Sequence, residues 1–146
     1  MANQAFNLRP ATEADFEAVL ALSIRAMREH LERIGRFDPD RRRERMRRQF
    51  DAGILHIIEQ DGVIAGCIGI EDQGAAVEIH SLFLDVHAQH QGLGEAVFRA
   101  TLAAHPGRPF RIEVLKQSPA RRFWERQGFV LTGEAAFDWL MERAPD

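Results

Sequence analysis

The sequence predicts a mixed α/β domain, in which helices pack on a mostly antiparallel sheet. A nearly continuous apolar run over residues 77–86 is typical of a strand covered on both faces. A turn containing Gly92 and Gly94 follows this run and leads into a helical pattern. Upstream, two β-rich runs flank the dipeptide Asp61-Gly62, which is typical of a tight hairpin.

Length and composition limit the number of domains and the class of protein. With 146 residues and 45% hydrophobic content, the chain is expected to form one domain over residues 1–146. A formal net charge of -3 argues against a nucleic-acid partner. A cytoplasmic protein without a membrane anchor is expected, because no long apolar span is present and residues 1–4 show no signal-peptide pattern. Cys67 is the single cysteine, and its apolar neighbours predict a core position.

Two helices are predicted after a short extended segment at residues 7–10. Thr12 and Asp15 suit the start of the first helix, in which apolar residues recur every three or four positions until Gly35. Asp38 followed by proline predicts the start of the second helix.

The second helix is rich in arginine. Its arginines are Arg41, Arg42, Arg43, Arg45, Arg47 and Arg48. They are interpreted as a solvated face with Asp40 and Glu44 as local partners, and an acidic binding partner is the alternative.

The remaining elements alternate between strands and helices. They are strands at residues 54–59, 63–70 and 77–86, a helix ending near residue 105, a strand at 110–115, a helix from 118 to 128, and strands at 129–131 and 137–141. The predicted order is therefore β-α-α-β-β-β-α-β-α-β-β.

The segment around the glycine turn contains a family motif. Leu84-x-Val86 followed by Gln91-x-x-Gly94-x-Ala96 resembles the acetyl-CoA motif of the GNAT superfamily of N-acetyltransferases. In that family the motif is Gln/Arg-x-x-Gly-x-Gly/Ala after an L-x-V strand end. Taken without this resemblance, a short glycine turn is more often a plain connection between strand and helix than a phosphate site.

A second register of the same motif begins at Gln89 and uses Gly92 and Gly94. The register from Gln91 is preferred, because the alternative puts His90 where family members usually have glycine.

Residues 114–129 look like the second motif of the family, in which Asn-Pro-Ala precedes an aromatic pair and Gly-Phe. The order of elements is also the one that GNAT enzymes use. The resemblance spans essentially the whole chain and implies the GNAT fold. In this fold a mixed, mostly antiparallel sheet contains a splayed parallel pair of central strands, here ending at Val86 and running over residues 110–115, flanked by about four helices.

The resemblance implies that the chain binds acetyl-CoA. The pantetheine arm would pair with backbone at the strand end, and the pyrophosphate would rest on N–H groups of the turn. A strand N–H near Leu84 would polarise the thioester carbonyl. The cofactor-binding residues implied are Leu84, Asp85, Val86, Gln91, Gly92, Leu93, Gly94, Glu95, Ala96, Ser118 and Trp124.

Catalysis requires a group that takes a proton from the amine. Glu78 and His80 lie two residues apart on the central strand and therefore share a face. His80 is the first candidate base, since imidazole titrates near pH 6.5 in water, and Glu78 is the second. For both, a purely structural role is the alternative. The histidines lack ligand spacing, so no metal site is expected.

The chain departs from the family in its second motif. Trp124 stands where many members have a tyrosine that protonates the departing thiolate, and the sequence contains no tyrosine. Water would then supply that proton. Ser118 replaces the usual asparagine and also suits a helix start. Trp124 would contact the pantetheine arm or fill the core.

The function predicted is transfer of an acetyl group from acetyl-CoA to a primary amine of a small molecule or protein. Dimers are common in the family, so the resemblance also implies a homodimer as one assembly to test. The first alternative is a catalytically weak GNAT-fold module that senses acyl-CoA. The second is a protein that binds an acidic partner through the arginine-rich helix. In the family, the segment between the first two helices borders the acceptor pocket, so the resemblance also implies that an arginine of this helix would help to select a substrate with an anionic group.

Overall fold

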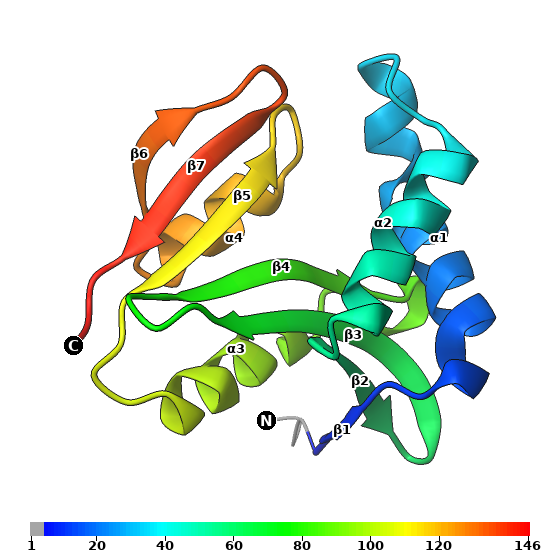
Figure 1. Ribbon diagram of the computed structural model, residues 1–146, viewed down its shortest axis with the longest axis horizontal. Coiled ribbons are helices and arrows are strands. Elements are labelled where there is room, and N and C mark those ends of the chain that lie inside the picture. The colour runs from blue at the N-terminus through cyan, green and yellow to red at the C-terminus, as the bar shows by residue number, and fades with distance from the viewer. Residues whose placement is uncertain (1–4) are drawn as a thin grey trace. The chain divides into compact units, whose positions relative to one another are not determined.

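The structure, a computed structural model, describes residues 5–146 (Figure 1). Residues 1–4, where the sequence shows no signal-peptide pattern, lie outside the described residues. The elements are β1 (Asn7–Pro10), η1 (Glu13–Asp15), α1 (Phe16–Arg33), α2 (Pro39–Asp51), β2 (Leu55–Gln60), β3 (Val63–Asp72), β4 (Val77–Leu84), η2 (Val86–Ala88), α3 (Leu93–Ala104), β5 (Phe110–Leu115), α4 (Ala120–Arg126), β6 (Val130–Glu134) and β7 (Asp138–Arg143).

The strands form a seven-stranded sheet in the order β1-β2-β3-β4-β5-β7-β6. β4 and β5 run parallel, whereas β1 with β2, β2 with β3, β5 with β7, and β6 with β7 pair antiparallel. This mixed sheet and the order of its elements confirm the predicted fold class. No helix within residues 5–146 is both long enough and apolar enough to cross a lipid bilayer.

Contacts within the chain group the residues into two compact units. The first contains the described residues up to Gly69 together with Ser81–Ala96, and the second contains Ile70–His80 and Val97–Asp146. β3, β4 and α3 therefore contribute to both units. The single domain expected over residues 1–146 stays a prediction.

Local sequence signals mark the starts of α1 and α2 and the end of α1. Thr12 and Asp15 form a reciprocal capping box, in which the Thr12 N–H donates to the Asp15 carboxylate at 2.7 Å. α1 ends before Gly35, whose φ of 69° lies in the left-handed region that favours glycine. The Asp38 carboxylate accepts a hydrogen bond from the Arg41 N–H at 3.3 Å and caps α2. The predicted helix starts are confirmed.

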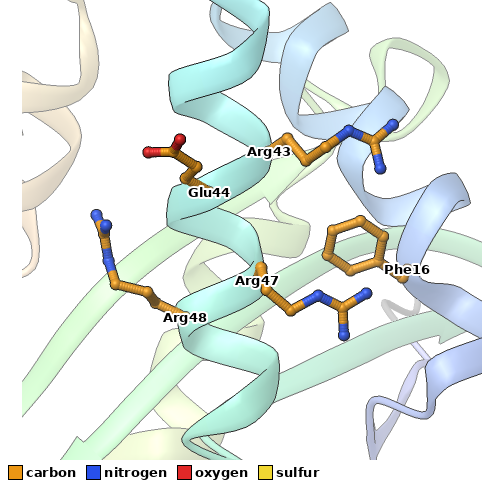
Figure 2. Close-up of a pocket in the computed structure, with 5 residues that line it drawn as sticks. All are labelled: Phe16, Arg43, Glu44, Arg47 and Arg48. Carbon is orange, nitrogen blue, oxygen red and sulfur yellow. The ribbon is translucent and has the colours of Figure 1, made fainter.

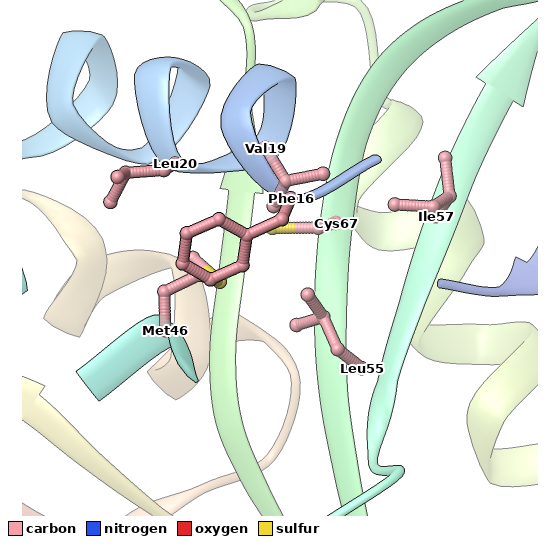
Figure 3. Close-up of a cluster of buried hydrophobic side chains, with 7 residues drawn as sticks. All are labelled: Phe16, Val19, Leu20, Met46, Leu55, Ile57 and Cys67. Atoms are coloured by element: carbon pink, nitrogen blue, oxygen red, sulfur yellow. The ribbon is translucent and has the colours of Figure 1, made fainter. Parts of the chain in front are cut away.

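A buried apolar cluster joins α1, α2, β2 and β3 within the first unit (Figure 3). Its members are Phe16, Val19, Leu20, Met46, Leu55, Ile57 and Cys67. Cys67 is fully buried, as predicted, and burial raises the pKa of its thiol to about 12. The thiol is therefore neutral at pH 7 and acts as a small apolar side chain.

The hairpin between β2 and β3 has the predicted tight turn. Asp61 and Gly62 both have positive φ, at 52° and 76°. Positive φ at both central residues is the geometry of a type I′ turn, whose twist matches that of the paired strands.

The second unit contains the parallel pair and an aromatic core. Val77 lies opposite Phe110 in the ladder between β4 and β5. Phe98 on α3 packs against Phe110, Trp124 and Phe129, with ring centroids 5.6, 5.3 and 5.5 Å apart. These contacts bind α3 and α4 to the strands of this unit.

Some boundaries differ from the prediction. β4 ends at Leu84 instead of Val86. The Val86 N–H donates to the Asp85 carboxylate at 2.9 Å, so it is not available for pairing between strands. Val86 then begins η2 with 65% of its surface exposed. β3 continues through Asp72, and α4 begins at Ala120 instead of residue 118. β6 and β7 each begin one residue later than predicted.

Candidate active site

The glycine turn leads directly into α3. Gly92 has a φ of 80°, and a Cβ atom added there would meet nothing within 4 Å. Its carbonyl accepts the first helical hydrogen bond, from the Ala96 N–H at 3.1 Å. The N–H groups of Leu93 and Gly94 lie ahead of that bond and have no acceptor within the helix. This start of α3 therefore has the geometry and the partial positive charge that suit a phosphate group.

Two glutamine side chains brace the segment that leads to this turn. Gln89 Nε2 donates to the Leu84 carbonyl at 2.9 Å, and Gln91 Nε2 donates to the His87 carbonyl at 2.9 Å. His90 adopts a φ of 62°, in the left-handed region that is uncommon for residues other than glycine. Both glutamines of the alternative motif registers thus fold back on their own loop.

The backbone that was expected to face a ligand at the end of β4 is bonded within the chain. The Asp85 N–H donates to the Ala65 carbonyl at 2.8 Å, and the Val86 N–H is held by the Asp85 carboxylate. The Leu84 carbonyl keeps a second lone pair beside its bond from Gln89. A ligand that uses the Val86 N–H must displace the Asp85 carboxylate.

Asp85 is itself held by α1. Arg25 forms two hydrogen bonds to its carboxylate, from Nε at 3.1 Å and from Nη2 at 2.8 Å. This pairing lowers the pKa of Asp85 below its usual range. The sequence contains no signal for this contact, because the two residues are 60 positions apart.

The candidate bases lie in a polar network of the second unit. His80 Nε2 lies 2.6 Å from Glu71 Oε1, and His80 Nδ1 lies 3.7 Å from Glu78 Oε2. Gln73 Nε2 donates to both carboxylates, at 3.3 Å to Glu71 and 3.2 Å to Glu78. The His80 and Gln73 hydrogen bonds lower the pKa of Glu71, so Glu71 is ionised at pH 7 and Nε2 carries the proton.

The structure therefore brings His80 and Glu78 together, as their spacing predicts. It adds Glu71 and Gln73, which sequence reasoning missed. The sequence did contain a signal for Glu71, because the short turn predicted after residue 70 brings the residues on its two sides close together.

Ser118 and Trp124 belong to the second unit, whereas residues 84–96 belong to the first. Ser118 Oγ accepts a hydrogen bond from the Ala120 N–H at 3.1 Å and so supports the start of α4. Trp124 is 4% exposed, and its ring packs edge-on against Phe123 and Phe129 at 4.9 and 5.2 Å. Each residue thus has a structural role, and contact with CoA stays a prediction for both.

A cavity of about 450 Å³ lies beside α2 in the first unit. It is lined by Phe16, Arg43, Glu44, Arg47 and Arg48 (Figure 2). Arg43 and Arg47 extend toward Phe16, and Glu44 and Arg48 extend to the other side of the helix.

The partners of these arginines differ from the expected local ones. Arg43 forms a bidentate pair with Glu17 at 2.8 and 2.9 Å. Arg47 donates from Nη1 alone to both carboxylate oxygens of Glu13, at 2.7 and 2.9 Å. Of the expected local partners, Asp40 contributes to the raised pKa of Arg43 through its charge, after Glu17. The ion pairs of Arg43 and Arg47 at this face of α2 are formed with carboxylates of α1 and η1.

Within residues 5–146, no group of three or more His, Cys, Asp or Glu side chains is arranged to hold a metal ion.

Comparison with known proteins adds three findings. A family model for the acetyltransferase (GNAT) domain matches residues 25–139. The 5-NmdU N-acetyltransferase of Pseudomonas phage PaMx11 is 32% identical over an alignment of 89 residues, which covers 59% of this chain and 64% of that protein. The match thus covers less than two thirds of the relative's length.

Solved structures share the fold. The PaiA N-acetyltransferase from Thermoplasma acidophilum, in complex with coenzyme A, has a TM-score of 0.74 at 15% identity, over 96% of this chain and 99% of that one. A GNAT-family acetyltransferase from Streptococcus agalactiae 2603 has a TM-score of 0.81 at 12% identity, over 98% and 97% of the two chains. At these identities the likeness shows the fold alone. Since the family model matches residues 25–139, most of the sequence, and the fold agrees, this chain belongs to the GNAT acetyltransferase family.

Proposed function

We propose that this chain is an acetyl-CoA-dependent N-acetyltransferase that acetylates a primary amine of a small molecule or of a protein. The observation that carries the proposal is the turn at Gly92, which presents the start of α3 to an anionic ligand. Family membership supports acetyl transfer, and the phage relative supports nitrogen as the acceptor atom. The name of that relative contains 5-NmdU, which is therefore one acceptor to test.

The turn fits the pyrophosphate of acetyl-CoA. Open space lies over Gly92, and the N–H groups of Leu93 and Gly94 have no acceptor within the helix. Gln91, Glu95 and Ala96 complete the turn. The backbone of residues 84–86 would hold the pantetheine arm, with the Asp85 carboxylate released from the Val86 N–H. Ser118 and Trp124 are proposed as further contacts.

Acetyl-CoA supplies a thioester, whose carbonyl carbon is open to attack by an amine. His80 is proposed to take the amine proton at Nδ1, because Glu71 holds the proton on Nε2. Glu78, 3.7 Å from Nδ1, stabilises the imidazolium that results. The carbon–nitrogen bond forms, the carbon–sulfur bond breaks, and water protonates the departing sulfur, since tryptophan stands at position 124.

The test is a calorimetric titration with acetyl-CoA and with desulfo-CoA, in Gly92→Val and in the matched Gly107→Val. Both glycines have positive φ, 80° and 70°, and open space around the missing Cβ, so both variants carry similar backbone strain. Gly92→Val is expected to weaken binding of both ligands at least tenfold, a loss of about 1.4 kcal/mol. Gly107→Val is expected to bind as the wild type does.

Equal affinity in the two folded variants would refute the assignment of the phosphate turn. Binding of both ligands without turnover of any amine would instead favour the acyl-CoA sensor. Thermal melting of each variant checks that it is folded.

A further inference from the structure

Four arginines of α2 differ in whether a carboxylate of the first unit neutralises them. Arg43 and Arg47 are neutralised by the carboxylates of Glu17 and Glu13. Arg42 and Arg45 lie on other faces of the helix, and neither forms an ion pair within the described part of the chain. The same helix thus satisfies two of its cations and leaves others without a counter-charge.

Arg42 occupies a position that faces the protein interior. It is followed at helical spacing by Met46 and Gln49, which are 2% and 7% exposed. Gln49 Oε1 accepts a hydrogen bond from Ser81 on β4 at 3.0 Å. Two residues further along β4, the Phe83 ring centroid lies 5.6 Å from the Arg42 guanidinium carbon. This stripe of α2 therefore lies along β4, and Arg42 lies near the end of that strand.

The Arg42 guanidinium lacks the partners that a buried cation needs. Its Nε is buried and has no hydrogen-bond partner within residues 5–146. Burial, and then the like charge of Arg45, lower the pKa of Arg42 to about 10. Cys67, the other titratable neighbour, has a neutral thiol at pH 7, so it provides no anion. At pH 7 Arg42 is therefore charged and not neutralised.

Such an arrangement is costly unless a ligand completes it. A buried N–H without a partner loses its hydration, and a buried charge without a counter-ion loses more. The Phe83 ring recovers part of this loss through its π face but leaves the Nε–H unsatisfied. A chain that only needed packing here would gain from an apolar residue, as it has at Met46.

We propose that Arg42, assisted by Arg45, binds a carboxylate or phosphate group of the acceptor, so that the substrate is an amine that carries an oxyanion. The planar guanidinium fork matches both groups and can bind either through two parallel hydrogen bonds. Phe83 immediately precedes Leu84, where the acyl group is proposed to lie, so this inference rests on the proposed function. The proposed function specifies a primary amine, and this inference adds that the same acceptor carries a carboxylate or phosphate group.

The first test follows the arginine Nε–H signals by NMR while inorganic phosphate is added to protein saturated with desulfo-CoA. Saturation occupies the phosphate turn, so the added anion reports on a different site. The Arg42 signal, assigned by its loss in Arg42→Met, is expected to shift saturably. The signal of Arg41, an exposed arginine of the same helix, is expected to show only the small, non-saturable shift that added salt causes. No saturable shift at Arg42, or equal shifts at both arginines, would overturn the proposal.

The second test compares Arg42→Met with Arg41→Met, which removes the same charge from an exposed position of α2. Without ligand, Arg42→Met is expected to melt at the wild-type temperature or about 2–4 °C higher, because an unpaired buried cation is removed. A clearly lower melting temperature would show that the guanidinium is a structural support and would contradict the inference.

Turnover provides the third measurement, with O-phosphoethanolamine and ethanolamine as matched acceptors. In the wild type, kcat/KM is expected to favour the phosphorylated amine at least tenfold, and Arg42→Met is expected to abolish that preference. Arg41→Met is expected to keep it. Equal use of both amines by the wild type would refute the substrate class.

The two proposals fail in different ways. If acetyl-CoA does not bind but phosphate still shifts the Arg42 signal in the free protein, the proposed function is wrong and the anion site stands. If acetyl-CoA binds and phosphate does not shift the Arg42 signal, the anion site is wrong and the proposed function stands.

Discussion

His80, the proposed general base, depends on its neighbours for the protonation pattern of its ring. Glu71, at 2.6 Å from Nε2, fixes the tautomer and leaves the lone pair on Nδ1. We predict that His80→Ala lowers kcat/KM at pH 7 by about 100-fold or more and removes one inflection from the pH–rate profile. Steady-state kinetics between pH 5 and pH 9 measure both. An unaltered profile would move the role of base to Glu78 or to water.

Glu71 contacts His80 Nε2 at 2.6 Å and is proposed to act through it as a positioning residue. Glu71→Gln is expected to lower kcat and to change the pH profile while the KM for acetyl-CoA stays the same, because the amide no longer fixes the imidazole proton. Glu113→Gln, an exposed change on β5, provides the control. If Glu71→Gln leaves kcat and the pH profile as they are in the wild type, the positioning role is refuted.

At the scale of elements, β3 approaches β4 closely at one glycine. A Cβ added to Gly66 would clash with the Phe83 carbonyl oxygen and lie 3.2 Å from the Leu84 Cα. Backbone atoms cannot rotate away, so Gly66→Ala is expected to lower the free energy of unfolding by about 1–3 kcal/mol. In Gly133→Ala the nearest atom is the end of a Leu140 side chain at 3.5 Å, an ordinary contact. Urea denaturation of both variants tests the contrast, and equal losses would refute the clash.

For the molecule as a whole, ion pairs that hold carboxylates make stability depend on pH. Arg9 holds the Asp15 carboxylate through two hydrogen bonds, and Arg25 holds that of Asp85, so both pKa values lie below the usual range. A lowered folded-state pKa adds stability that is present above the unfolded pKa of about 3.9 and is lost as the pH falls. The urea midpoint is therefore expected to decrease steadily from pH 5 to pH 2.

Asp15→Asn isolates one part of this dependence. Asp15 is 8% exposed, and loss of its charge is expected to cost about 1.5–3 kcal/mol at pH 7 and to make the acid decline less steep. An Asp15→Asn midpoint that falls in parallel with the wild type would show that this pair does not contribute to the acid decline.

Much of the fold was predictable because its signals are local. Asp38 before proline, Asp61-Gly62 and the apolar run after Val77 each specify their element through short-range physics. The end of β4 was not predictable. Val86 is apolar and suits a strand, but its N–H is taken by the Asp85 carboxylate, which Arg25 holds in place.

The sequence by itself determined the elements, their order, the glycine turn and the family, since all of these depend on residues a few positions apart. Only the tertiary structure decided which charges are paired. Six arginines of α2 look alike in the sequence, yet Arg43 and Arg47 meet carboxylates of η1 and α1 whereas Arg42 faces Phe83. The physical reason is that a side chain's partners follow from the face that its helix buries, and that face is set by packing between distant segments.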